Sequence, residues 1–231
     1  MIQIENISKK FGGNTAVNIP HLEIQKNESF GLVGNNGAGK TTLFRMLLDL
    51  IRPSSGKVMI AGSNVKGNSN WKKFTGSYLD EGFLIGFLTP DEYFNFIGGL
   101  HNINKAEVNE RLQGFEDFFN GEITGNKKYI RDLSKGNQKK VGIAAAMLSR
   151  PELLVLDEPF ANLDPSTQIR LKNILRKYKS NNENTLLVSS HDLNHVTEVC
   201  ERIVVLEKGE TIKDIKTGET TLKELEEYFA A

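Results

Sequence analysis

Residues 34–42 read Gly34-Asn35-Asn36-Gly37-Ala38-Gly39-Lys40-Thr41-Thr42. This stretch matches GxxxxGK[ST], and it lies between the apolar run 29–33 (SFGLV) and a second apolar run that ends at residue 50. A glycine-rich loop between a strand and a helix brings backbone N–H groups onto phosphate oxygens, and the helix dipole favours anions. We therefore expect all nine residues to bind a nucleoside triphosphate, with Lys40 at the β- and γ-phosphates and the Thr41 hydroxyl on Mg²⁺.

The apolar run 153–156 (LLVL) is followed directly by the acidic pair Asp157-Glu158. An apolar strand that ends in two acids can place one carboxylate near Mg²⁺ and the other near the γ-phosphate. We expect Asp157 to hold the metal and Glu158 to polarise the attacking water as the general base. A solvated Asp-Glu turn is common in any protein, but its combination with the phosphate loop favours the catalytic interpretation.

Strand-like runs alternate with helix-like segments along most of the chain. The runs are 2–7, 29–33, 57–60, 153–156, 186–189 and 203–206, and the helix candidates are 42–50, 138–149, 165–178 and 193–200. Continuous β-branched runs are typical of strands that are covered on both faces, as in a parallel sheet. Strands that alternate with helices indicate the α/β class.

The middle of the chain has a different character. Residues 83–119 hold seven of the thirteen Phe and no convincing strand. Val108, Leu112, Phe115 and Phe119 fall at i, i+4, i+7 and i+11, which predicts one stripe of a single helix. We expect one domain over residues 1–231 with a helical subdomain inserted at about 80–135. Its aromatic residues either fill a small core or line an exposed groove for a partner.

Composition excludes several classes of protein. The 231 residues carry no formal net charge, are 39% hydrophobic and include a single cysteine, Cys200. This is the composition of a soluble globular chain, without an internal disulfide framework and without an electrostatic reason to bind nucleic acid. No apolar segment approaches the roughly 18–20 residues of a membrane span, and the N-terminus does not resemble a signal peptide. We expect a cytoplasmic protein that reaches a membrane only through a partner.

Three further motifs complete a family pattern. They are 133–138 (LSKGNQ), 161–164 (ANLD) and 189–192 (SSHD). Together with the phosphate loop and the acidic pair, in this order, they resemble the ATP-binding subunit of ATP-binding-cassette (ABC) transporters, whose signature, D-loop and switch loop they match. The resemblance implies a P-loop NTPase fold with a RecA-like core, an N-terminal antiparallel β subdomain and an inserted helical subdomain.

The resemblance also implies individual roles. Phe11 matches the aromatic residue that stacks on adenine, with Val17 near the base or the ribose. His191 matches the histidine that contacts the γ-phosphate and positions the water and the general base. Where family members usually carry Gln, this chain has Asp80-Glu81; we assign Asp80 as a metal ligand, with the register open by one residue.

The signature implies a dimer. Ser134, Gly136 and Asn137 resemble the residues that close on the γ-phosphate held by the opposite subunit, and Asp164 matches the D-loop residue that couples the two sites. Two ATP molecules then lie between head-to-tail subunits, which are two copies of this chain or this chain and a homologue. Lys135 and Asn137 depart from the common LSGGQ, and LSKGN-type variants are similar to those of drug and antimicrobial-peptide exporters.

The resemblance therefore implies an ATPase with ATP and Mg²⁺ that powers transport through separate membrane-spanning permease subunits at the cytoplasmic face of the membrane. The LSKG signature, the missing Gln and the short chain favour export, and the helical insertion would receive a coupling helix of the permease. The alternative is a soluble ABC ATPase that acts as a mechanical clamp in a cell-envelope complex. A P-loop kinase or GTPase should lack LSKGNQ and His191.

Overall fold

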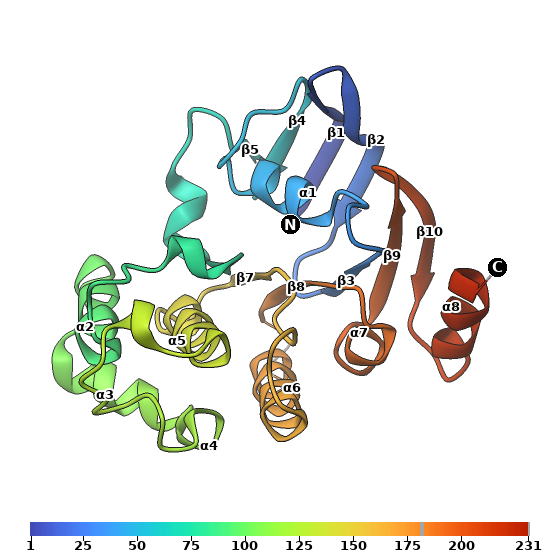
Figure 1. Ribbon diagram of the computed structural model, residues 1–231. Coiled ribbons are helices and arrows are strands. Elements are labelled where there is room, and N and C mark those ends of the chain that lie inside the picture. Colours follow the sequence, from blue (N-terminus) through green and yellow to red (C-terminus); the bar gives the residue numbers. More distant parts are fainter. Residues whose placement is uncertain (181–182, 231) are drawn as a thin grey trace.

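Two β-sheets lie one above the other in the computed structural model, which describes residues 1–180 and 183–230 (Figure 1). The smaller sheet is antiparallel with strand order β2-β1-β4-β5, and the larger sheet has the order β10-β9-β3-β8-β7-β6. All neighbours in the larger sheet are parallel except β10, which pairs antiparallel with β9. The predicted P-loop NTPase fold, with an antiparallel subdomain formed by the N-terminal strands, is confirmed.

The strands of the two sheets come from separate parts of the chain. The antiparallel sheet consists of β1 (Ile2–Phe11), β2 (Asn14–Ile24), β4 (Ser55–Ile60) and β5 (Ser63–Asn64). The larger sheet consists of β3 (Ser29–Val33), β6 (Thr75–Tyr78), β7 (Leu153–Leu156), β8 (Thr185–Ser190), β9 (Arg202–Glu207) and β10 (Glu210–Lys216).

Helices cover the larger sheet. Helix α1 (Lys40–Leu47) lies between the two sheets, and α5 (Lys135–Met147), α6 (Pro165–Lys179) and α7 (Leu193–Val199) cover the opposite face (Figure 1). Helix α8 (Thr221–Ala230) lies beside β10. Every residue of β7 and β8 is buried, as expected for strands covered on both faces. One face of the larger sheet is covered by α1 and the antiparallel sheet, and the other face is covered by helices.

The segment from 80 to 135 is helical. It contains α2 (Pro90–Leu100), α3 (Lys105–Gln113) and α4 (Glu116–Phe119), with short 3₁₀ turns at Glu81–Phe83 and Ile130–Asp132, and it lies beyond β6 at one end of the larger sheet (Figure 1). A further 3₁₀ turn, Asn70–Phe74, leads into β6. These helices lie within residues 80–135, and the division of the chain into one domain with an inserted subdomain stays a prediction.

The prediction of one helical stripe through Val108, Leu112, Phe115 and Phe119 is wrong. Helix α3 ends at Gln113, and Phe115 precedes the separate helix α4. Glycine has a low helix propensity, and Gly114 stands at this break. All four side chains are nevertheless buried, and the Phe119 ring stacks on Phe115 and on Phe94 of α2, each at 5.9 Å between centroids. Tertiary packing therefore keeps the apolar residues on one side after the helix has ended.

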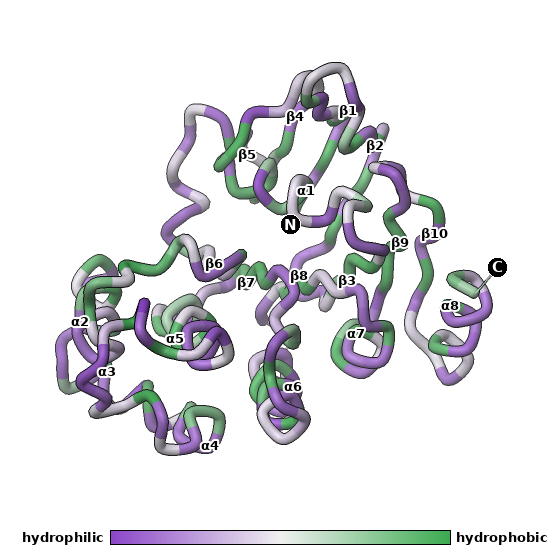
Figure 2. The backbone as a smooth tube through the Cα atoms, viewed as in Figure 1, coloured by the Kyte–Doolittle hydropathy of each residue, from purple (hydrophilic) through white to green (hydrophobic). Residues whose placement is uncertain are grey.

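Two hydrophobic cores hold the layers together. One lies between the sheets and includes Phe44 of α1 and Leu187 of β8, and the other joins the larger sheet to the helices below it and includes Leu186 and Phe160. Figure 2 shows hydrophobic stretches along the central strands and hydrophilic residues on the outer turns of the helices. Among the helices that the structure describes, none has both the length and the hydropathy that a membrane span requires.

Gly76→Ala is expected to destabilise the fold by about 1–3 kcal/mol, because β6 and α5 approach each other at this glycine. A Cβ there would overlap the backbone carbonyl oxygen of Ala146 and would lie 2.9 Å from the Pro151 ring. Gly99→Ala is the matched control, since a Cβ at this position in α2 meets nothing within 4 Å. Urea unfolding should show a lower midpoint for the first variant and an unchanged or higher one for the second. Equal midpoints would refute the close contact of β6 with α5.

Candidate active site

The glycine-rich loop runs from the end of β3 into α1, as the motif predicts. Gly37 and Gly39 have φ values of 83° and 108°, which a side-chain-bearing residue rarely adopts. A Cβ on Gly39 would also lie 2.6 Å from the Ala16 carbonyl oxygen of β2. The loop lines a cavity of about 200 Å³ whose walls include Ala16, residues 36–42 and Glu158. Phosphates bound here would meet the first turn of α1 and the acidic end of β7.

The Lys40 side chain is buried inside this loop. Its ammonium donates to the Gly34 carbonyl oxygen at 2.6 Å and forms an ion pair with Glu158 Oε1 at 3.2 Å. The ammonium thus lies between the phosphate loop and the predicted general base, where phosphate oxygens would compete with Glu158 for its charge.

Thr41 and Asp157 meet across the site. The Thr41 hydroxyl donates to Asp157 Oδ2 at 2.5 Å, and the Ser189 hydroxyl of β8 donates to Asp157 Oδ1. Burial raises the pKa of Asp157, and these two hydrogen bonds oppose the rise. Hydroxyl and carboxylate oxygens are the donors that Mg²⁺ prefers beside nucleotide phosphates. The pair Thr41 and Asp157 therefore fits the expected metal.

Asp80 does not contact Thr41 or Asp157 and has other partners. Its carboxylate forms an ion pair with Arg45 of α1 at 3.2 Å and accepts from the Gly82 N–H at 2.8 Å. The next residue, Glu81, accepts a hydrogen bond from the Tyr78 hydroxyl at 3.1 Å. The structure therefore brings Thr41 and Asp157 together but joins neither Asp80 nor Glu81 to them by a direct hydrogen bond or ion pair.

Glu158 has an unusual backbone conformation. Its φ is 46°, although it is not a glycine and it precedes Pro159, and a proline further restricts the residue before it. Such a conformation costs on the order of 1–3 kcal/mol and persists only where the surroundings enforce it. The Glu158 N–H donates to Ser189 Oγ at 2.9 Å, and the Glu158 carbonyl oxygen accepts from Lys139 Nζ at 2.8 Å.

The Glu158 carboxylate is directed by the end of β8. Its Oε2 lies 2.8 Å from His191 Nδ1 and accepts from the His191 N–H at 3.3 Å. The His191 side chain is half exposed, whereas Glu158 is partly buried. Two bonds from one residue orient the carboxylate towards the cavity that the phosphate loop lines, as a general base requires.

The predicted adenine contacts lie on the hairpin that joins β1 and β2. Phe11 is 51% exposed, and its ring faces the Lys9 ammonium at 5.0 Å. Val17 is fully buried behind Gly39, while its neighbour Ala16 lines the cavity. Phe11 is therefore available for stacking, and the contact of Val17 with a base or ribose stays a prediction.

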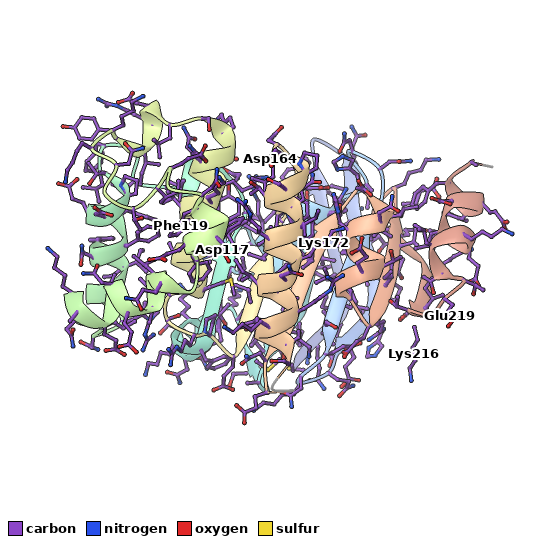
Figure 3. All side chains as sticks on the ribbon, turned by 90° about the horizontal axis from the view of Figure 1, so that it is seen from below. Asp117, Phe119, Asp164, Lys172, Lys216 and Glu219 are labelled. Carbon is purple, nitrogen blue, oxygen red and sulfur yellow. The ribbon has the colours of Figure 1, made fainter. Side chains whose placement is uncertain are left out.

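The signature residues begin α5. Ser134 caps the helix by accepting from the Asn137 N–H at 3.2 Å, and a Cβ on Gly136 would lie 3.0 Å from the Asn162 carbonyl oxygen. Asp164 caps α6 in the same way through the Thr167 N–H at 3.0 Å, and Figure 3 shows it at the start of that helix. Hydrogen bonds from Ser166 and Thr167 lower the pKa of Asp164. Ser134, Gly136 and Asn137 are not among the residues that line the phosphate-loop cavity.

The ABC transporter family matches residues 17–161. The chain belongs to this family. The family assignment predicted from the five motifs, that of an ABC ATPase subunit, is therefore confirmed.

Relatives cover most of this ABC chain. An uncharacterized ABC transporter ATP-binding protein of Bacillus subtilis, YhaQ, is 36% identical over 99% of this chain and 74% of its own length. The bacitracin transport ATP-binding protein BcrA of Enterococcus faecalis is 33% identical over 95% of this chain and 70% of its own. This chain spans only 54% of the length of a further relative, an uncharacterized ABC transporter ATP-binding protein of Synechocystis.

A solved structure has the same fold as this ABC chain. The bacterial ABC transporter cassette MJ0796, in its dimeric structure, matches with a TM-score of 0.83 at 25% identity over 94% of this chain and 99% of that one.

Two side chains of this ABC site were missed by sequence reasoning. Ser189 binds both the Asp157 carboxylate and the Glu158 N–H. Its position in the SSHD motif could have indicated it, since β8 and β7 are neighbours in the sheet. Lys139 lies within the predicted helix 138–149, and its partner, a backbone oxygen, leaves no signal in the sequence.

Proposed function

We propose that this chain is the ATP-hydrolysing subunit of an exporter whose membrane-spanning subunits are separate chains. The observation that carries the proposal is a connected cluster of five side chains, of which three line the phosphate-loop cavity and the other two form hydrogen bonds to them. They come from α1, from the end of β7 and from the end of β8, and they are Lys40, Thr41, Asp157, Glu158 and His191.

The chemistry follows from the contacts of these side chains. ATP phosphates attract the Lys40 ammonium, which releases Glu158 from its ion pair. Glu158 then accepts the proton of a water molecule while the water oxygen attacks the γ-phosphorus, and the bond to the bridging oxygen breaks to leave ADP. His191 orients the Glu158 carboxylate. Thr41 and Asp157 would hold Mg²⁺, which neutralises charge on the phosphates when bound.

Two copies of the chain complete each other's sites in this proposal. The signature residues at the start of α5 lie outside the phosphate-loop cavity of their own chain, so they are free to close on nucleotide held by a partner. The N-terminus of α5 would present its dipole to the γ-phosphate. ATP then favours the closed head-to-tail dimer because it binds that state more tightly, and hydrolysis reopens the dimer.

The proposed direction of transport rests on the relatives. BcrA is named for bacitracin transport, and LnrL of Bacillus subtilis, 33% identical over 92% of this chain, for linearmycin resistance. We assign an antimicrobial compound as the class of substrate. The permease would dock at the helical segment, where an apolar cavity of about 370 Å³ lies beside β6, α2 and α5 and is lined in part by Phe83.

Phe11→Ala is expected to weaken ATP binding roughly 5- to 150-fold, because stacking of a base on an aromatic ring contributes about 1–3 kcal/mol. Phe11→Trp should restore the affinity, and Phe87→Ala is the matched control, since Phe87 is also exposed, at 66%, but lies in the helical segment. Titration with a fluorescent ATP analogue measures all three. An unchanged dissociation constant for Phe11→Ala would exclude the stacking role.

Proteoliposomes that contain the membrane subunits with this chain on the outside test the proposed function. With external Mg-ATP and bacitracin as the probe, export predicts ATP-dependent accumulation of the peptide in the lumen. In vesicles loaded with bacitracin, ATP-dependent loss of the peptide from the lumen would indicate import. Hydrolysis that is stimulated by the membrane subunits but moves no antimicrobial peptide would favour the mechanical clamp.

A further inference from the structure

Two neighbouring lysines of α5 are almost completely buried. Lys139 and Lys140 are 4% and 3% exposed, although lysine is almost never buried without a partner. The Lys140 ammonium pairs with Glu122 of the helical segment at 2.6 Å. The Lys139 ammonium instead donates to a backbone atom, the carbonyl oxygen of Glu158, at 2.8 Å. The two lysines therefore connect α5 to the helical segment and to the backbone of Glu158.

Lys139 also contacts the end of β6. Its ammonium lies 5.9 Å from the centre of the Tyr78 ring, and the Tyr78 hydroxyl donates to Glu81 at 3.1 Å. Three residues further along α5, Gly142 packs directly against the same ring, which leaves no room for a Cβ. Burial lowers the pKa of Lys139, while the carboxylates of Glu81, Glu158 and Asp157 oppose that shift. The ammonium therefore has both a cation–π contact and nearby negative charge to offset its desolvation.

The bond from Lys139 reaches the strained residue of the site. Glu158 has its left-handed φ of 46° directly before Pro159, and the surroundings must hold it there. Its carbonyl oxygen accepts from Lys139 and, more weakly, from the Ala161 N–H at 3.3 Å. Lys139 is the only charged donor to this carbonyl among the described residues. Rotation of the peptide at Glu158 would break this bond and turn the carboxylate away from His191.

We propose that Lys139 is a positioning residue for hydrolysis, which holds the backbone of Glu158 in the conformation that aims its carboxylate into the phosphate-loop cavity. This inference rests on the proposed role of Glu158 as the general base. Because Lys139 stands on α5 and also contacts Tyr78, a displacement of α5 relative to β6 changes the geometry of the base. Lys139 thus links the signature helix and the segment 78–81 to the catalytic carboxylate.

Lys139→Met tests the proposal, because methionine keeps the length of the side chain and removes the charged donor. We expect kcat to fall roughly 10- to 100-fold, the equivalent of one hydrogen bond from a charged group, while KM for ATP changes less than about twofold. Lys139→Gln, which retains an N–H donor, should recover part of kcat. Lys140→Met is the matched control: it removes a lysine equally buried in the same helix, and kcat should remain that of the wild type.

Crystal structures of the same variants provide a readout that does not depend on turnover. The proposal predicts that Glu158 leaves its left-handed conformation and loses its contact with His191 in Lys139→Met but not in Lys140→Met. The proposal is overturned if Lys139→Met keeps the wild-type geometry at Glu158, or if both variants lower kcat equally. Failure of the general-base assignment is detected separately, by Glu158→Gln that still hydrolyses ATP.

Discussion

Glu158→Gln is expected to lower ATP hydrolysis by about 10²- to 10⁴-fold, the usual contribution of a general base, and to leave ATP binding intact. The amide cannot accept the proton of the attacking water, but it has nearly the same size and can still meet the N–H of His191, which lies 3.3 Å from Glu158 Oε2. The Glu158 side chain is not part of either hydrophobic core, so the variant should fold. Phosphate release and ATP titration measure the two properties separately.

Glu152→Gln is the matched control for this variant. Glu152 stands directly before β7, and Glu158 follows Asp157 at the other end of that strand. The Glu152 side chain forms a surface ion pair with Lys26 at 3.4 Å, where both side chains are more than half exposed. Such pairs contribute little to stability. The control should hydrolyse ATP at the wild-type rate. Hydrolysis by Glu158→Gln at the same rate as by Glu152→Gln would remove Glu158 from the mechanism.

Lys40→Met is expected to weaken ATP binding roughly 100-fold or more, and hydrolysis falls with it. The ammonium is the buried cation of the phosphate loop, and each hydrogen bond from a charged group to phosphate contributes about 1.5–3 kcal/mol. Methionine fills nearly the same volume, and the loop keeps its other bonds, such as the one from the Ala38 N–H to the Asn35 carbonyl oxygen. Titration with Mg-ATP measures the loss.

The two variants separate binding from chemistry. Glu158→Gln binds ATP without hydrolysing it, whereas Lys40→Met does not reach the bound state. Lys26→Met is the matched control, because it removes an exposed lysine that precedes β3, whereas the phosphate loop follows the opposite end of that strand. This variant should bind ATP normally. An ATP affinity of Lys40→Met within about threefold of that of this control would contradict the placement of Lys40 at the phosphates.

Sequence reasoning located the parts of the fold that depend on local patterns. Buried strands such as β7 and β8 consist of continuous apolar residues, and the phosphate loop has a spacing that few other structures require. Strands β6 and β10 were not predicted. Strand β6 reads TGSY, and in β10 exposed residues alternate with half-buried ones, without a buried position. Strand β6 pairs with β7, which is remote in the sequence, and β10 pairs with the preceding strand β9. Their strand conformation therefore depends on this pairing more than on their own residues.

In the candidate site, too, local patterns could be predicted from the sequence and contacts between distant elements could not. Side chains that end strands, such as Asp157 and His191, could be placed from the chain alone because neighbouring strands end together. Side-chain contacts between different elements could not be predicted in this way. Asp80 is an example: a carboxylate suits a metal, but here it forms an ion pair with Arg45 of α1. Lys139 was equally hidden, because its partner is a backbone oxygen whose position depends on the unusual φ of Glu158.

The mass of the Glu158→Gln variant in Mg-ATP tests the central claim most directly. Light scattering coupled to size-exclusion chromatography should give twice the chain mass of 25.8 kDa with Mg-ATP and the single mass without nucleotide. Ser134→Arg, which places a bulky side chain where the signature meets the partner's phosphate, should stay at the single mass in the same background. A Glu158→Gln protein that binds ATP and remains at 25.8 kDa would contradict a site that two copies of this chain complete together.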